Sequence, residues 1–229
     1  MENSAATFNT AEIFLILSLK PDKAGFLVPE HIRFPGLTGA LLLDLCIAGN
    51  IAVDKKNLVP LSQENRLSSP YKEIFEQIAG RTKTRKVKRW VSKLSSQARR
   101  YQKSVLKGLE KKGSLVTEHK KFLFFSYYKT RLNDTGTREK LIAQIRNFVL
   151  AGDKPGNEMA AVLALIEACK LHKLICRDRR EIRLFRPKMK EILKEDAISE
   201  SVGKIISEMQ AAIMGAVAAT SVAGTASSK

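Results

Sequence analysis

The chain has 229 residues, of which 44% are hydrophobic and 28% are charged. This balance is that of a folded protein with a sizeable core, and it excludes an intrinsically disordered chain. The formal net charge of +17 points to a polyanionic partner, either nucleic acid or an anionic membrane. We expect a single domain spanning residues 1–229, with an ordered core at about residues 10–218 and a flexible tail at 219–229.

The first third of the sequence predicts helices separated by loops and one hairpin. Residues 10–19 have the pattern of a capped helix, and two prolines bracket an irregular loop at 29–35. Residues 36–48 are apolar on nearly every side, which predicts a buried helix. A short hairpin is expected at 51–61, followed by a helix at 70–80.

Residues 81–112, the basic segment, concentrate the charge of the molecule. They hold 13 lysines and arginines against Glu110 alone, so +12 of the net charge of +17 lies there. Apolar residues recur at three- and four-residue spacing, which predicts a core helix whose outer face meets polyanions. Ser95 and Ser96 interrupt the pattern and could cap a second helix near Gln97, so one helix and two helices in series both fit. The alternative interpretation of the charge is a solvated face that only keeps the protein soluble.

A second hairpin is expected at residues 114–128. Two β-like runs, 115–117 and 122–128, are separated by a basic tip at 118–121. The aromatic residues at its end either cover the core or form an exposed apolar edge for membrane contact or self-association. The candidate membrane-contact and oligomer-contact residues are Lys120, Lys121, Phe122 and Phe124.

The remainder of the chain predicts helices at 134–150, 157–175, 177–194 and 198–219, joined by loops short enough for antiparallel packing. The helix at 177–194 carries a second cluster of basic residues, partly offset by acids at helical spacing. Three cysteines, in apolar helical contexts, cannot form a disulfide framework, which indicates a reducing, cytoplasmic setting.

Neither a metal site nor a catalytic site is predicted. Cys169, His172 and Cys176 share one helical face, but three ligands on one helix cannot surround a tetrahedral zinc ion alone, so core packing is favoured. His31 and His119 have no partner at ligand spacing. The sequence contains no P-loop, no dinucleotide fingerprint, no HExxH and no GxSxG, so no cofactor is expected.

The order of these pieces resembles the Golgi phosphoprotein 3 family, its bacterial members above all. The resemblance rests on GLTGALLLDLCIAGNI at residues 36–51, the hairpin after it, the helices of Trp90 and Arg99, and LEKKGSL at 109–115 leading into FLFF at 122–125. It covers about residues 10–218. It implies a mainly α, single-domain helical bundle ringed by amphipathic helices, with short β-hairpins and no catalytic activity.

The resemblance also implies a ligand. Eukaryotic members of the family are peripheral membrane proteins that bind phosphatidylinositol 4-phosphate through a basic pocket and hold Golgi enzymes by their cytoplasmic tails. Of the pocket residues, one arginine carries over as Arg99; a second falls on Gln102, a helix-start arginine falls on Thr38, and residues 31–36 contain no tryptophan. Arginine forks and a free helix start at residue 37 could still hold a phosphate. The candidate headgroup-binding residues are Arg99, Arg100, Lys103 and Arg33.

We therefore expect a non-enzymatic, cytoplasmic protein that docks anionic phospholipid or phosphoinositide headgroups at a membrane surface, the Golgi membrane in a eukaryote. No apolar stretch approaches the roughly 20 residues that cross a bilayer, so the association would be peripheral. The protein could act as an adaptor for membrane enzymes and form a homo-oligomer through the 114–128 hairpin. The alternatives are a nucleic-acid-binding helical protein that uses the same basic face, and an enzyme with an unfamiliar site.

Overall fold

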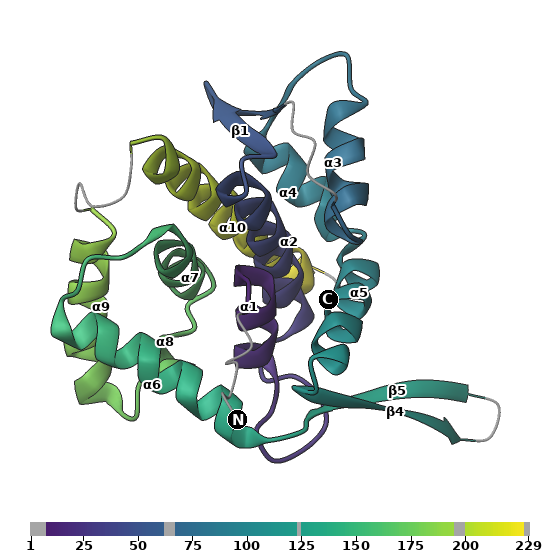
Figure 1. Cartoon of the computed structure of the whole chain (residues 1–229), viewed down its shortest axis with the longest axis vertical. Helices are drawn as coiled ribbons and strands as arrows, with labels where there is room; N and C mark the ends of the chain where they lie inside the picture. The colour runs from purple at the N-terminus through teal and green to yellow at the C-terminus, as the bar shows by residue number, and fades with distance from the viewer. Residues whose placement is uncertain (1–7, 62–66, 123–124, 195–199, 227–229) are drawn as a thin grey trace, which may run out of the picture.

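The structure is a computed structural model of the chain, and it describes residues 8–61, 67–122, 125–194 and 200–226. Within these residues the fold is mainly α, with two small antiparallel sheets (Figure 1), as the sequence predicts. The helices are α1 (Thr10–Ser18), α2 (Glu30–Ile47), α3 (Tyr71–Ala79), α4 (Val87–Ser95), α5 (Ala98–Lys111), α6 (Thr135–Ala151), α7 (Asn157–Ala168), α8 (His172–Ile175), α9 (Arg179–Ile192) and α10 (Glu200–Ala226). The strands are β1 (Ile51–Asp54), β2 (Asn57–Pro60), β3 (Arg85–Lys86), β4 (Leu115–Phe122) and β5 (Phe125–Leu132).

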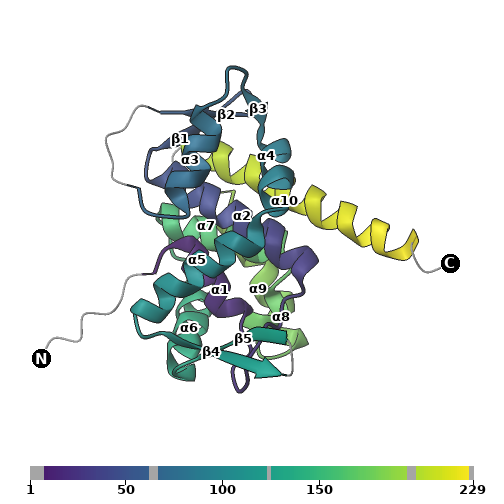
Figure 2. The same ribbon diagram turned by 90° about the vertical axis from the view of Figure 1, so that its right-hand side faces the viewer.

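Helix α2 lies at the centre of the bundle and contacts α1, α4, α5, α7 and α10 (Figures 1 and 2). Its leucines are almost completely buried, which confirms the predicted core helix. Two glycines permit the close packing: a Cβ atom on Gly39 would collide with the Ile213 side chain of α10, and one on Gly36 with the Phe14 ring of α1. The apolar circumference of α2 is therefore satisfied by neighbours on several sides.

The start of α2 differs from the prediction. The helix begins at Glu30, so the segment expected to be an irregular loop forms its first turns and Pro35 lies inside it. Pro29 caps the helix with its carbonyl oxygen, which accepts hydrogen bonds from the N–H groups of Ile32 (3.0 Å) and Arg33 (2.8 Å). Pro35 is the sixth residue of the helix, so it lacks the N–H group that would bond to the His31 carbonyl, and the packing of α2 within the bundle offsets this loss. The consequence is that Arg33 projects from a helix rather than a loop.

The basic segment forms two helices in series, α4 and α5. The serines between them do not cap α5: the Ser95 hydroxyl donates to the Val91 carbonyl (2.6 Å) and that of Ser96 to the Lys93 carbonyl (2.7 Å). Both helices bury the predicted apolar stripe, with Trp90 and Tyr101 at most 1% exposed. The sequence did not predict β3, a two-residue strand that pairs with β2 and extends the first hairpin to three strands.

The second hairpin, β4 and β5, is longer than the prediction. Its register runs from Leu115 opposite Leu132 to Phe122 opposite Phe125, so residues 118–121 lie within β4 and not at a basic tip. The hairpin projects away from the helices on the side where α3, α4 and α5 lie (Figure 1).

Two helix boundaries in the second half also differ. The helix expected at 157–175 is split into α7 and α8 at Lys170, which has a positive φ of 54°. Helix α10 continues to Ala226 and so passes the expected end at residue 219. All three cysteines are free and buried, and burial raises the pKa of the Cys169 thiol to about 12. His172 Nε2 lies 2.8 Å from the Glu167 carboxylate, and the described residues include no group able to hold a metal ion.

Candidate anion-binding site

A basic cavity of about 940 Å³ opens between the start of α2, the outer face of α5 and the base of the β4–β5 hairpin. We call it the α2–α5 cavity. Its charged lining consists of Glu30, Arg33, Arg99, Lys103, Lys107, Glu110 and Lys129. Five cations therefore face two acids in one concave site, and this arrangement suits an anionic ligand.

Arg33 is the fixed cation of the cavity. The residue is only 5% exposed, and its Nε donates a hydrogen bond to Gln102 Oε1 at 2.8 Å. Nη1 donates to the Val28 carbonyl, and the guanidinium lies 3.9 Å from the centroid of the Phe26 ring. Burial lowers the pKa of Arg33, with Glu30 acting in the opposite direction. The guanidinium stays charged, because the ordinary pKa of arginine is so high, and it is held in one orientation before any ligand arrives.

Arg99 is the exposed counterpart of Arg33. Its side chain is 77% exposed, and its Nη2 lies 3.0 Å from Glu30 Oε2. The other oxygen of the same carboxylate lies 3.5 Å from Nη2 of Arg33. Two guanidinium groups from different helices thus converge on a single anionic group. A fork of this kind matches the oxygens of a carboxylate or a phosphate.

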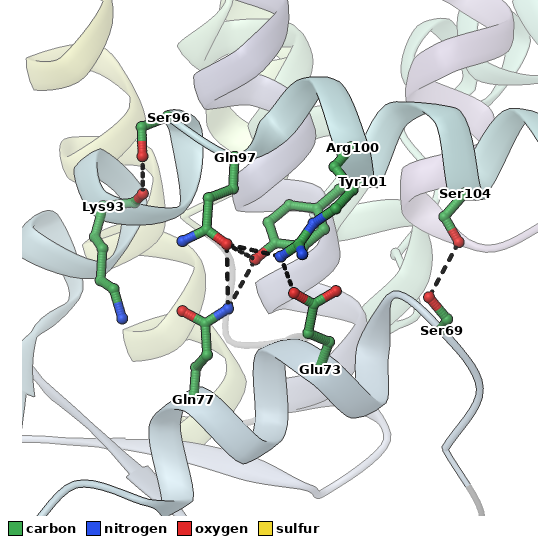
Figure 3. Close-up of polar contacts among 9 residues, drawn as sticks. All are labelled: Ser69, Glu73, Gln77, Lys93, Ser96, Gln97, Arg100, Tyr101 and Ser104. Atoms are coloured by element: carbon green, nitrogen blue, oxygen red, sulfur yellow. Dashed lines mark hydrogen bonds and ion pairs between the residues drawn. The ribbon is translucent and has the colours of Figure 1, made fainter.

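The structure brings three of the four predicted headgroup residues together: Arg33, Arg99 and Lys103 all line the α2–α5 cavity. Arg100 lies outside it. Figure 3 shows Arg100 turned toward α3, where its Nη2 meets the Glu73 carboxylate and lies 2.8 Å from Gln97 Oε1. Consecutive helical residues point about 100° apart, so the Arg99 and Arg100 side chains leave α5 in different directions.

The expected phosphate site at the helix start near residue 37 is wrong. Because α2 begins at Glu30, Thr38 lies in the middle of the helix and is 0% exposed. Its hydroxyl lies 3.5 Å from that of Ser95, away from the cavity lining. A helix start seven or so residues earlier leaves no free N–H groups at this point.

Sequence reasoning missed several residues of the cavity. Lys107 follows Arg99 and Lys103 at four-residue spacing, so helical periodicity could have identified it. For Gln102 the sequence shows only the lack of the family arginine, whereas in the structure its side-chain oxygen accepts a hydrogen bond from Arg33 and holds it in position. Phe26 and Lys129 come from a loop and from β5, and no periodicity connects them to α5.

Three of the four predicted hairpin residues lie within the described part of the chain. Lys120, Lys121 and Phe122 lie in β4, where the structure describes the backbone and its pairing. Phe124 lies outside the described residues. Membrane contact or self-association through these residues remains a prediction.

A comparison with protein families finds a match to this chain. A family model described as Golgi phosphoprotein 3 (GPP34) matches residues 11–209, nearly the whole described fold. The chain belongs to the Golgi phosphoprotein 3 family. The resemblance seen in residues 36–51 and 109–125 is therefore confirmed, and the Golgi phosphoprotein 3 match includes every residue of the α2–α5 cavity. The comparison with curated proteins finds no match.

Among the helices that the structure describes, none is long and apolar enough to cross a bilayer.

Proposed function

We propose that the protein is a non-enzymatic peripheral membrane protein whose α2–α5 cavity binds an anionic lipid headgroup, phosphatidylinositol 4-phosphate by family resemblance. The observation that carries this proposal is the convergence of Arg33 and Arg99 on one carboxylate in a basic cavity. A headgroup phosphate would replace Glu30 between the two guanidinium groups, with Lys103, Lys107 and Lys129 around it.

The energetics favour a phosphate over the internal carboxylate. The Glu30–Arg99 pair is largely exposed, and such pairs contribute at most about 1 kcal/mol. A phosphate monoester brings up to two charges and three acceptor oxygens. Each basic residue close to an anionic surface adds about 1 kcal/mol, so the cations of the cavity suffice for reversible docking.

The hairpin supplies a second means of attachment. Thr117 of β4 and Lys129 of β5 line the cavity, and the hairpin extends outward from the same side of the molecule (Figure 1). Its distal sequence, FLFFSYY, is rich in aromatic residues, which favour the membrane–water interface. A bound headgroup would thus direct the hairpin toward the bilayer, unless self-association occupies it.

The cellular role that we propose is inferred from the family resemblance. The protein would act at the cytoplasmic surface of a membrane, the Golgi membrane in a eukaryote, as an adaptor that holds membrane enzymes by their cytoplasmic tails. The competing function is nucleic-acid binding through the same basic face, because phosphodiester backbones also attract residues 81–112.

Vesicle co-sedimentation tests the proposal, with neutral vesicles, phosphatidylserine vesicles and vesicles that carry phosphatidylinositol 4-phosphate at matched charge. Arg99→Gln is compared with Arg100→Gln, a control with the same charge loss on the next residue of α5. We expect Arg99→Gln to weaken binding about fivefold and Arg100→Gln to weaken it less. Stronger binding to the phosphoinositide than to phosphatidylserine would support headgroup selectivity. Failure of the wild type to bind any vesicle refutes the proposal, and binding to RNA or DNA instead would favour the competing function.

A further inference from the structure

A second basic cavity lies where the loop after α3 meets β3 and α4. It consists of two adjoining hollows of about 640 and 560 Å³ that share Arg85, Arg89 and Lys93. Arg81 and Lys83 line the first hollow, and Lys86 and Lys88 line the second. None of the residues that line the α2–α5 cavity contributes to it. We call it the α4 cavity.

Seven cations of the α4 cavity face a single acid in its lining, Glu76. Within the described part of the chain, none of its seven lysines and arginines forms an ion pair. Glu76, the acid in the lining, lies 3.9 Å from Lys72. The α2–α5 cavity differs, because Glu30 already neutralises part of its charge. Like charges held together without a counter-ion raise the free energy of the unliganded protein, and a bound anion relieves this.

Two of these cations lie beside a buried aromatic ring. The guanidinium of Arg81 lies 5.6 Å and the ammonium of Lys93 5.0 Å from the ring centroid of Trp90. Trp90 is 1% exposed, so its ring cannot move aside. Partial burial lowers the pKa of Lys93, and the neighbouring charges of Arg81 and Arg85 act in the same direction. Contact with the Trp90 ring restricts the two cations before a ligand binds, and this reduces the entropy lost on binding.

The start of α4 adds to the positive potential. The first turn of this nine-residue helix contains Lys88 and Arg89 but no acidic residue, and Lys86 provides no side-chain cap. Cations are unfavourable at the positive end of a helix, whereas anions are stabilised there. The second hollow opens on this first turn.

We propose that the α4 cavity is a second phosphate-binding site. It would bind headgroup phosphates of lipids in the same membrane whose headgroup binds in the α2–α5 cavity. This inference rests on the proposed function. Figure 2 views the molecule from the side of α3, α4 and α5, with β3 and α4 above and α5 descending to the hairpin, so both cavities belong to elements of one side. The two hollows with their shared cations fit two phosphate groups, carried by one lipid or by neighbouring lipids.

Attachment through both cavities would change the affinity of the protein for a membrane and its orientation there. Binding at one cavity raises the effective concentration of phosphate at the other, so affinity increases steeply with the density of anionic lipid. It also fixes the angle of the molecule on the membrane, and with it the direction of the hairpin.

The test uses the full chain and three double variants that each remove two cations: Arg85→Gln with Arg89→Gln in the α4 cavity, Arg99→Gln with Lys103→Gln in the α2–α5 cavity, and Arg179→Gln with Arg183→Gln as the control. The control residues are exposed on α9, on the opposite side of the bundle from α5 (Figure 1). Vesicle binding is measured at increasing phosphatidylserine content. Thermal unfolding with inorganic pyrophosphate measures the binding of phosphate groups at each cavity in the absence of a membrane.

The α4-cavity variant is expected to weaken vesicle binding about 30-fold and to reduce its dependence on lipid density. The control should change binding no more than about twofold, because salt screens distant charges. Pyrophosphate should raise the unfolding temperature of the wild type and of the α2–α5 variant more than that of the α4-cavity variant.

Each contrary result has a distinct meaning. If the α4-cavity variant matches the control in both assays, the second site does not exist, while a loss of vesicle binding in the α2–α5 variant alone would leave the proposed function standing. If pyrophosphate binds at the α4 cavity but no vesicle binds the wild type, both the proposed function and the membrane source are refuted. Binding of RNA or DNA that depends on Arg85 and Arg89, without vesicle binding, would identify a nucleic-acid site instead.

Discussion

The carboxylate of Glu30 should compete with the ligand of the α2–α5 cavity, so Glu30→Gln should strengthen the binding of anionic vesicles. Glu30 lies 3.0 Å from Arg99 and 3.5 Å from Arg33, in the position where the two guanidinium groups converge. Glutamine has nearly the same size, and its amide oxygen still accepts a hydrogen bond, but it carries no charge. The substitution therefore tests the charge at this point and changes the packing little.

Two contributions set the size of the effect. The exposed pair of Glu30 with Arg99 stabilises the unliganded cavity by at most about 1 kcal/mol, which a ligand must overcome. Repulsion between the carboxylate and an incoming phosphate at a separation of about 4 Å adds about 1 kcal/mol in a water-like medium. Together they predict tighter binding by about 5-fold to 30-fold.

The assay is titration of the protein with phosphatidylserine vesicles and with phosphoinositide vesicles, at low and at high salt. Glu191→Gln is the matched control, because it removes one exposed acid from α9 on the opposite side of the bundle. We expect Glu30→Gln to exceed Glu191→Gln in affinity for both anionic vesicles, most clearly at low salt. Equal affinities of the two variants would refute the competition, and weaker binding by Glu30→Gln would mean that the carboxylate is needed to position the arginines.

The remaining predictions concern the fold that holds the cavity. Asp44 accepts hydrogen bonds from the N–H groups of Thr10 (2.9 Å) and Ala11 (3.1 Å) and from the Tyr71 hydroxyl (2.8 Å), so Asp44→Ala should lower the free energy of unfolding in urea by about 3 kcal/mol, and Asp44→Asn by less; equal stability of Asp44→Ala and wild type would contradict this. Burial lowers the pKa of His172, with Glu167 opposing, so the folded protein binds fewer protons and stability should fall as the pH drops below about 6.5; His172→Gln should flatten the profile, and an unchanged profile would show that His172 is not responsible. Gly39→Ala should destabilise the protein by about 1–3 kcal/mol, because its Cβ collides with α10, and a neutral result in thermal unfolding would show that the helices can separate freely.

Features that depend on interactions between residues close in sequence could be predicted, whereas features that depend on contacts between distant segments could not. Periodicity identified the buried α2, the amphipathic α4 and α5 and the second hairpin, because local spacing determines which side chains share a face. It failed at Pro35, which local propensity assigns to a loop, because the surrounding bundle stabilises a helix there. It also missed β3, whose two residues become a strand only by pairing with β2.

The charge of the basic segment and the family of the chain follow from the sequence alone, since both are properties of residue identity and order. Which cations act together was decided by the tertiary structure. Arg33 and Arg99 belong to α2 and α5 and meet only because these helices pack side by side, whereas Arg99 and Arg100 are adjacent in the chain and face different partners. A binding cavity depends on contacts between distant segments, and the free energy that sets those contacts comes from the buried core rather than from the residues that line the site.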